Sequence, residues 1–317
     1  ARYRATRPMN TCVRLRNDPH ARIGYHSSVD HRLTFHPTAE AFIAAAAPYL
    51  EAREERYGLL LGLARRFAET GESGDRYVFA TAEQDGAPIG AVLRSPRHKI
   101  LLSDLPEAWI APAAAQLAVR LPAAPGVQGE ESRAKAFAEA WRTLRDVVVL
   151  PGRAQRLYVL RELVAPRPTS GSTRRATAVD EPLLQRWVRA FMADVGSPAS
   201  DFHPSYVQRL LASDAVLLWE DQGQAVSCAA CSRETPQGAS VSLVYTPDEC
   251  RGRGYATNVT AQLTQELLAR GKQFTTLYTD RANPVTNSIY QQIGYRPIAD
   301  ELELWFDDGS LGATARS

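Results

Sequence analysis

The pattern of apolar and polar positions predicts that helices and short strands alternate in the first half of the chain. Apolar residues three and four positions apart indicate helices, and short apolar runs bounded by turns such as Asp85-Gly86 indicate strands. The predicted elements are two helices within 37–70, strands at 77–82, 88–93 and 99–102, helices at 108–121 and 130–144, and a strand at 155–163. This order is typical of an α/β or α+β domain.

In the second half, strands first follow one another and then alternate with helices. Apolar residues on one face of 181–195 predict a helix with a buried stripe. The other predicted elements are a helix at 204–212, strands at 215–219, 225–232 and 240–246, a helix at 256–270, a strand at 274–279, a helix at 284–293 and a strand at 301–306. We expect the three consecutive strands to form an antiparallel meander. The fold class is therefore α/β, of the α+β type with a mixed sheet.

The segment 165–177, with the sequence APRPTSGSTRRAT, separates the two patterned halves. Proline, glycine, serine and threonine concentrate in linkers and turns. The sequence therefore predicts an N-terminal α/β domain at 1–165, a linker at 166–177 and a second domain at 178–310.

Composition places the chain among globular proteins and narrows its partners. Of 317 residues, 44% are hydrophobic and 23% are charged, which is close to the average for globular proteins and leaves room for two domains. The formal net charge is only +2, so we expect no nucleic-acid partner. The most apolar windows, 41–50 and 109–121, are too short to span a membrane, so no membrane association is expected.

Cysteine usage favours a reducing compartment. Four scattered cysteines are too few for a disulfide framework, and we therefore expect a cytoplasmic location; they are Cys12, Cys228, Cys231 and Cys250. Cys228 and Cys231 form a C-x-x-C pattern, but in a strand this odd separation places the two thiols on opposite faces.

The early histidines also lack the spacing of metal ligands; they are His20, His26, His31 and His36. We expect no metal site in this chain.

A basic loop with two glycines stands between a predicted strand and a predicted helix, within 244–256. Gly252 and Gly254 permit backbone conformations and a close approach that side chains would block. The first N–H groups of the following helix have no intrahelical partner and carry positive dipole charge. Arg251 and Arg253 add full positive charges, so the segment is suited to bind a phosphate group.

Two familiar phosphate loops do not fit this segment. The chain contains no G-x-x-x-x-G-K-[ST] sequence, and Gly252-Arg-Gly254-Tyr-Ala-Thr257 lacks the third glycine of the dinucleotide fingerprint. From 244 to 295 the sequence instead resembles the GNAT superfamily of acyl-CoA-dependent N-acetyltransferases, whose [QR]-x-x-G-x-[GA] loop binds the CoA pyrophosphate. Arg251-Gly-Arg-Gly254-Tyr-Ala256 matches that pattern at every defined position.

A second segment carries the same resemblance. Asn283 is followed by Tyr290 and then by Gly294-Tyr295, which is similar to the family's asparagine, tyrosine and glycine-aromatic spacing. We expect Asn283 to cap a helix that has Pro284 in its first turn. The resemblance covers about 173–306 and implies a GNAT fold for that part of the chain.

The resemblance also implies a function. It implies transfer of an acetyl group from acetyl-CoA to a primary amine, by direct attack in a ternary complex and without a metal, with a small-molecule or peptide amine as acceptor. Tyr290 would act as the general acid that protonates the departing thiolate. The residues implied to bind the cosubstrate are Leu243, Val244, Tyr245, Thr246, Arg251, Gly252, Arg253, Gly254, Tyr255, Ala256, Thr257, Asn283, Asn287 and Tyr290. The alternative function is a non-catalytic acyl-CoA-binding or sensor protein.

The chain departs from the family at the general base. Many members carry a glutamate on the strand that precedes the loop, whereas 241–246 contains no carboxylate. A lysine-like amine is mostly protonated near neutral pH, so some group must accept its proton. The candidates are Asp280, Glu234, Asp201 and His203.

The first half has a similar order of elements, so it is either a degenerate copy of the same fold or an unrelated α/β module. At 99–115 the equivalent strand and helix are joined without glycine, and Asp104 and Glu107 stand where a phosphate would bind. We therefore expect one acetyl-CoA per chain, bound by the second half. The sequence indicates neither the acceptor nor the oligomeric state.

Overall fold

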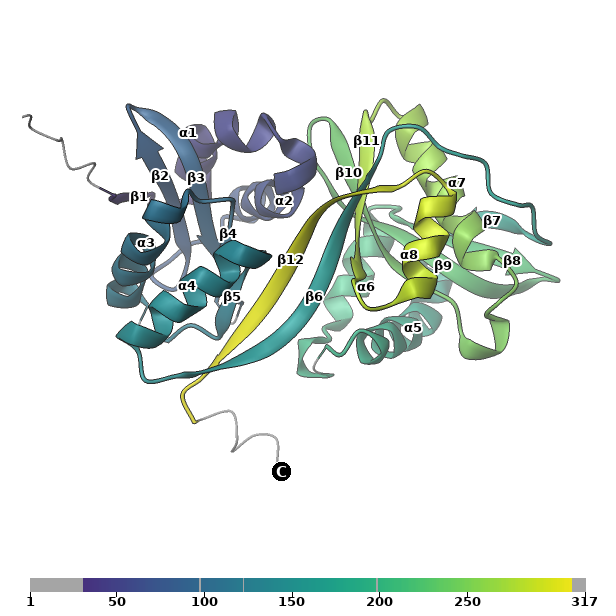
Figure 1. Ribbon diagram of the computed structural model, residues 1–317. Helices are drawn as coiled ribbons and strands as arrows, with labels where there is room; N and C mark the ends of the chain where they lie inside the picture. Colours follow the sequence, from purple (N-terminus) through teal and green to yellow (C-terminus); the bar gives the residue numbers. More distant parts are fainter. Residues whose placement is uncertain (1–30, 97, 122, 198, 310–317) are drawn as a thin grey trace, which may run out of the picture. The chain divides into compact units, whose positions relative to one another are not determined.

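The computed structural model describes residues 31–96, 98–121, 123–197 and 199–309, which lie in a single compact unit that begins at His31 (Figure 1). Cys12, His20 and His26 lie outside the described residues. All of the described strands belong to one twelve-stranded sheet, with the order β1-β2-β3-β4-β5-β12-β6-β11-β10-β9-β8-β7. Both parallel and antiparallel neighbours occur in it, which confirms the expected mixed α/β class.

The first half contributes five strands to one end of the sheet and two pairs of helices. The strands are β1 (Leu33–Phe35), β2 (Val78–Gln84), β3 (Ala87–Arg94), β4 (Ile100–Leu102) and β5 (Gly126–Glu130). The helices are α1 (Ala39–Glu51), α2 (Glu54–Thr70), α3 (Glu107–Arg120) and α4 (Glu131–Leu144). The apolar side chains of α1 and α2 pack on one face of these strands, and those of α3 and α4 pack on the other.

The second half has the same plan. Its strands at the other end of the sheet are β7 (Ser172–Arg175), β8 (Val216–Asp221), β9 (Gln224–Glu234), β10 (Gly238–Tyr245) and β11 (Phe274–Asp280). Its helices are α5 (Glu181–Asp194), α6 (Pro204–Ala212), α7 (Tyr255–Ala269) and α8 (Pro284–Gln292), with short 3₁₀ turns η1 (Ala178–Asp180), η2 (Ala199–Asp201) and η3 (Asp248–Cys250). The pairs α5–α6 and α7–α8 pack on opposite faces.

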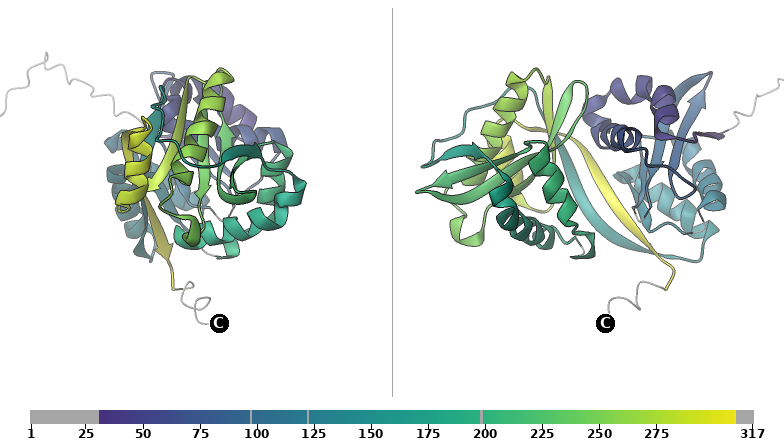
Figure 2. Two further views of the ribbon diagram at one scale, coloured as in Figure 1. Left: turned by 90° about the vertical axis from the view of Figure 1, so that its right-hand side faces the viewer. Right: turned by 180° about the vertical axis from the view of Figure 1, so that it is seen from behind.

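Each half also lends its last strand to the other half. β6 (Val148–Leu160) ends the first half and pairs antiparallel with β11, where Leu277 lies opposite Tyr158. β12 (Arg296–Asp307) ends the second half and pairs antiparallel with β5, where Leu302 lies opposite Gly129. β6 and β12 run side by side and pair with each other along nearly their whole length (Figure 1, Figure 2). Each half is therefore completed by a strand of the other.

The two halves repeat one topology. In each, a meander of antiparallel strands leads into a strand, a helix and a further parallel strand, which are β4-α3-β5 in the first half and β10-α7-β11 in the second. The antiparallel order predicted for 215–246 is thereby confirmed. The structure favours the degenerate copy over an unrelated module, because the position of every strand in one half has a counterpart in the other.

The sequence pattern did not predict three of the strands, and β6 and β12 begin earlier than it predicted. β1, β5 and β7 are short, and β5 contains two glycines, which are poor strand residues. Gly126 is required at the start of β5, because a Cβ there would lie 2.0 Å from the carbonyl oxygen of Leu304. β7 lies inside the segment predicted as a linker, so that segment is partly strand. The bounds of the two domains remain predictions.

The C-x-x-C pattern behaves as expected. Cys228 and Cys231 are both buried in β9, and they belong to the two cores on opposite faces of the sheet. Burial raises the pKa of Cys231 to about 11 and that of Cys228 to about 12. Within the described ranges, no three histidine, cysteine or acidic residues are grouped as metal ligands would be. None of the described helices combines the length and the apolar composition needed to cross a membrane.

Candidate functional site

The basic loop leads from η3 into α7 and has the backbone geometry of an anion site. Gly252 and Gly254 have φ values of 78° and 83°, which residues with a side chain rarely adopt. All four residues of the loop from Arg251 to Gly254 are exposed. Gly254 is the N-cap of α7 and offers no side chain to its first N–H groups, so these groups are available to a ligand.

The two arginines of this loop have different surroundings. Arg251 is held by Asp194 of α5 at 2.7 Å and by Asp248 at 2.9 Å, and its Nε donates to the carbonyl of Thr246. Among the described residues, the side chain of Arg253 has one long hydrogen bond, of 3.4 Å, to the carbonyl of Glu249. Arg251 therefore ties the loop to the domain, while Arg253 is the freer cation.

Strand β10 separates from β11 before it reaches the loop. Their parallel pairing ends where Ser240 lies opposite Thr276. Further along β10 the pairing with β9 shifts register, and Leu243 has a φ of 48°, which marks a bulge. The backbone of β10 beyond Ser240 therefore borders an opening between two diverging parallel strands.

Tyr290 lies on α8 at this opening. Its ring is 8% exposed and packs edge-on against Tyr295, with 6.0 Å between ring centroids. No hydrogen bond of its hydroxyl is found among the described residues. Burial raises the pKa of Tyr290 above its ordinary value, so the phenol stays protonated at neutral pH and is able to donate a proton or a hydrogen bond.

The two asparagines of the tyrosine segment have internal partners. Asn283 caps α8, as expected, and its Oδ1 accepts from the backbone N–H groups of Val285 and Thr286. The Oδ1 of Asn287 accepts from Thr279 at 2.6 Å and from Tyr158 at 3.0 Å. Both side chains therefore position α8, and their role in cosubstrate binding remains a prediction.

The other residues predicted to bind the cosubstrate lie between β10 and the first turn of α7. Leu243 and Val244 border the cavity described below, Tyr245 is the last residue of β10, and Thr246 follows it on the way to the loop. In the first turn of α7, Ala256 and Thr257 are partly exposed, whereas Tyr255 is buried and its hydroxyl donates to Asp221.

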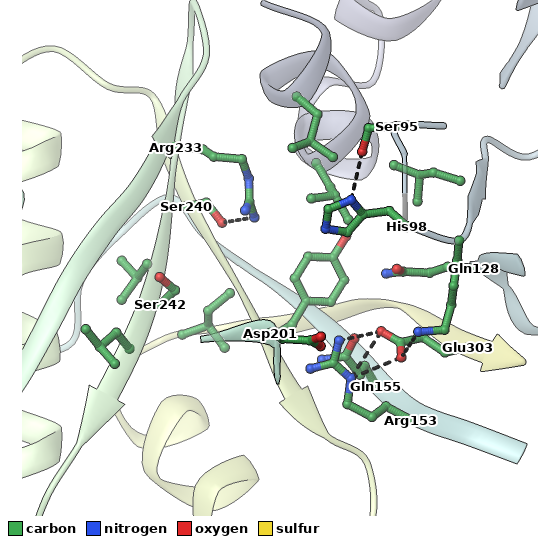
Figure 3. A pocket seen from close by; sticks show the side chains of 18 of the residues that line it. Ser95, His98, Gln128, Arg153, Gln155, Asp201, Arg233, Ser240, Ser242 and Glu303 are labelled. Carbon is green, nitrogen blue, oxygen red and sulfur yellow. Dashed lines mark hydrogen bonds and ion pairs between the residues drawn. The ribbon is translucent and has the colours of Figure 1, made fainter. Parts of the chain in front are cut away.

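A cavity of about 830 Å³ extends from β10 and Tyr290 to residues of the first half. Figure 3 shows side chains that line it. Its lining includes residues of β9, β10, β11 and α8 from the second half, of α2 and β5 from the first half, and of the exchanged strands β6 and β12. The cavity therefore exists only because the two halves share a sheet.

The candidate bases divide into two groups. Asp201 and His203 line the cavity, whereas Glu234 and Asp280 are absent from its lining. Glu234 lies 3.0 Å from Lys272, and Asp280 accepts from the backbone N–H of Ala282. Proximity to the cavity therefore favours the segment that joins η2 to α6.

The sequence did not point to an ionic cluster that surrounds the buried Glu303 in the cavity wall. Glu303 on β12 lies 2.6 Å from Arg153 on β6 and 3.1 Å from Lys99. Burial by itself would raise the pKa of Glu303, but Arg153 and Lys99 hold it below its ordinary value. No local sequence pattern predicts this cluster, because its members come from three distant parts of the chain.

At the equivalent place in the first half, a different arrangement follows β4. Asp104 lies 2.8 Å from Arg56, which is also 2.5 Å from the buried Glu301. Glu107 opens α3 in place of a glycine loop. The strand exit thus carries carboxylates where the second half carries arginines.

Comparisons with known proteins agree with this description. A family model described as "FR47-like protein" matches residues 222–305. Among solved structures, the chain is similar to a Drosophila protein at 16% identity, with a TM-score of 0.61, covering 86% of this chain and 97% of that one. It is also similar to a GNAT-family acetyltransferase from Colwellia psychrerythraea at 11% identity, with a TM-score of 0.54, covering 87% and 100%.

A third similar structure is a GCN5-related N-acetyltransferase from Sphaerobacter thermophilus, at 16% identity with a TM-score of 0.51, covering 87% of this chain and 95% of that chain. Identities this low show a common fold, which here extends over both halves. A search of the curated proteins found no match.

Proposed function

We propose that the protein is an acetyl-CoA-dependent N-acetyltransferase, because residues 222–305 match the FR47-like family model and the fold is similar to that of GNAT-family structures. The acetyl group passes to a primary amine of a small molecule or peptide by direct attack in a ternary complex, in the cytoplasm and without a metal. The observation that carries the proposal is that Tyr290 and the diverging part of β10 line one cavity, while the same strand leads to the cationic loop.

The residues on this path fit the cosubstrate. The backbone N–H groups that follow Gly254 and the side chain of Arg253 suit a pyrophosphate, since both present positive charge on an exposed surface. The backbone of β10 beyond Ser240 has no partner in β11 and can pair with an extended amide-containing chain. The cosubstrate supplies an activated thioester carbonyl, and the chain supplies its orientation.

Two side chains handle protons in this proposal. Tyr290 donates its hydroxyl proton to the thiolate leaving group. This proton is available because burial raises the pKa of the phenol. His203 accepts the proton of the attacking amine, since imidazole is the side chain suited to proton exchange near neutral pH. The two carboxylates of the lining are less suited to this role, because Glu303 is paired with Arg153 and Lys99, and Asp201 interacts electrostatically with Lys99.

The experiment is release of free CoA from acetyl-CoA across a panel of amines, amino acids and peptides, with His203→Gln as the test of the base. We expect turnover with at least one acceptor. His203→Gln should lower the rate of turnover, and this decrease should become smaller as the pH rises, because the amine then loses its proton without a base. Acetyl-CoA binding by calorimetry without release of CoA for any acceptor would instead favour the non-catalytic acyl-CoA-binding or sensor protein.

A further inference from the structure

The charges that line the cavity do not balance. The described lining carries four cations, on Arg66, Lys99, Arg153 and Arg233, but only two carboxylates, on Asp201 and Glu303. Lys99 and Arg153 both pair with Glu303. The positive charge that remains lies on Arg66 and Arg233, where α2 approaches β9.

Arg233 is the more informative of the two. It enters the cavity from β9, and its Nη2 donates to Oγ of Ser240 at 3.1 Å (Figure 3). Its Nε is buried without a partner, and no carboxylate within the described residues forms an ion pair with it. Arg233 is only partly exposed, and withdrawing a guanidinium from water without supplying a counter-charge is costly.

The helix opposite makes room for this side chain. Gly62 lies within α2, where glycine weakens a helix by about 1 kcal/mol relative to alanine. A Cβ at Gly62 would lie 3.2 Å from Cδ of Arg233, which is tighter than ordinary contact. One turn further along α2, Arg66 also lines the cavity and also has a buried Nε without a partner. Glu72 interacts electrostatically with Arg66 but forms no ion pair with that side chain. Its carboxylate instead accepts a hydrogen bond of 2.8 Å from the hydroxyl of Tyr77.

The position of Arg233 separates it from the phosphate end of the site. Arg233 lies opposite Ser240, near the start of β10, whereas the cationic loop follows the end of that strand. At about 3.3 Å per residue, Ser240 is about 10 Å from the bulge at Leu243 and still farther from the loop. Arg233 therefore faces the side of the bulge that is remote from the pyrophosphate.

We propose that Arg233, assisted by Arg66, binds a carboxylate of the substrate inside this cavity. The inference rests on the proposed acyl transfer and narrows it to amines that also carry a carboxylate, such as amino acids or peptides with a free C-terminus. A planar guanidinium binds a carboxylate through two parallel hydrogen bonds. Purely cationic acceptors such as polyamines are disfavoured, because they would add positive charge to a cavity that already has a surplus.

The test uses acceptors in matched pairs, each as the free acid and as the carboxamide, at several amine-to-carboxylate spacings. Suitable pairs are glycine and glycinamide, γ-aminobutyrate and its amide, and dipeptides and their amides. For pairs that react with acetyl-CoA, we expect kcat/KM to be about 10- to 100-fold higher for the acid, the range of a charged hydrogen bond. In Arg233→Met the acid should fall to the level of its amide, whereas Arg186→Met, on the exposed side of α5, should keep the preference.

A second arm identifies the source of the carboxylate, since a dicarboxylic acyl group would satisfy the same arginine. Succinyl-CoA serves as the donor in this arm. If Arg233 binds the carboxylate of the acyl group, Arg233→Met should weaken succinyl-CoA binding at least 10-fold but leave acetyl-CoA binding within about 2-fold. Equal use of acids and amides, together with equal binding of both donors by wild type and variant, would overturn the proposal.

The outcome is separable from that of the proposed function. If acetyl-CoA binds but no acceptor reacts, acid and amide probes are compared by the rise that they cause in the melting temperature of the CoA-bound intact chain. A rise for acids alone that Arg233→Met removes would support the carboxylate site in a binding protein. An equal effect of acids and amides, or no effect of either, would refute it.

Discussion

The hydroxyl of Tyr158 donates a hydrogen bond of 3.0 Å to Oδ1 of Asn287, so a strand from the first half holds the helix that carries Tyr290. Tyr158 is fully buried, and Asn287 also bonds to the end of β11 and to the start of α8. The first half therefore supports the candidate catalytic tyrosine directly, in addition to closing the cavity.

Tyr158→Phe should lower the free energy of unfolding by about 1 kcal/mol, since one buried hydrogen bond is lost while the ring still packs. Turnover should also fall, because α8 loses one of its attachments. Chemical denaturation and steady-state kinetics measure the two effects. Tyr57→Phe removes a buried hydroxyl contact with Tyr49 in the first half and should affect stability alone.

Tyr290→Phe should slow turnover by about 100- to 10,000-fold while acetyl-CoA affinity changes by no more than a few-fold. The reason is that the phenol proton is lost and the packing of the ring is kept. Single-turnover kinetics and calorimetry give the two quantities. Tyr57→Phe, whose hydroxyl bonds to Tyr49 in the first half, is the control. Unchanged chemistry-limited turnover would remove Tyr290 from the mechanism.

Gly254→Glu should abolish acetyl-CoA binding. The variant places a negative charge at the start of α7 and a side chain on a residue with a φ of 83°, where only glycine is relaxed. Gly86→Glu is the matched control, because Gly86 has a φ of 77° and open space around it in the β2–β3 turn. If both folded variants bind acetyl-CoA like the wild type by calorimetry, the loop has been assigned wrongly.

The ion pairs of Glu303 should make stability depend on pH. The pKa of Glu303 is lower in the folded state than in the unfolded chain, so its pairs add stability above the unfolded pKa, and this is lost as pH falls through the folded value. At neutral pH, Glu303→Gln should cost about 3 kcal/mol, because the mostly buried Lys99 loses its counter-charge; Arg153 is 43% exposed and stays solvated.

The measurement is denaturant unfolding of wild type and variant at a series of pH values. The difference between them should shrink below about pH 4, near the ordinary range of a glutamate. Glu139→Gln, at an exposed pair with Arg142, should show little difference at any pH. A difference that stays constant into acid would show that Glu303 contributes by packing alone.

The intact chain should bind one acetyl-CoA. At the exit of β4, Asp104 is paired with Arg56 and Glu107 opens α3, and such carboxylates repel a pyrophosphate. Titration calorimetry measures the stoichiometry, and the intact chain is required because β6 stands between β11 and β12. A value near two would show that the first half retains a site.

The sequence by itself determined the features that depend only on neighbouring residues. The glycines of the loop, the cap at Asn283 and the separation of Cys228 from Cys231 follow from backbone geometry within a few residues, and the structure bears each of them out. Most helices and the longer strands were predictable for the same reason, since their periodicity is written in consecutive residues.

Only the tertiary structure decided the exchange of β6 and β12 and everything that depends on it. Strand order has no local signature, so the sequence could not show that Lys99 and Glu303 would meet, or that Arg233 would face a cavity beside α2. The short strands β5 and β7 form because longer neighbours offer them unpaired backbone groups, not because of their own side chains. The loop and the tyrosine helix could therefore be predicted from the sequence, while the cavity is formed by contacts between residues far apart in the chain.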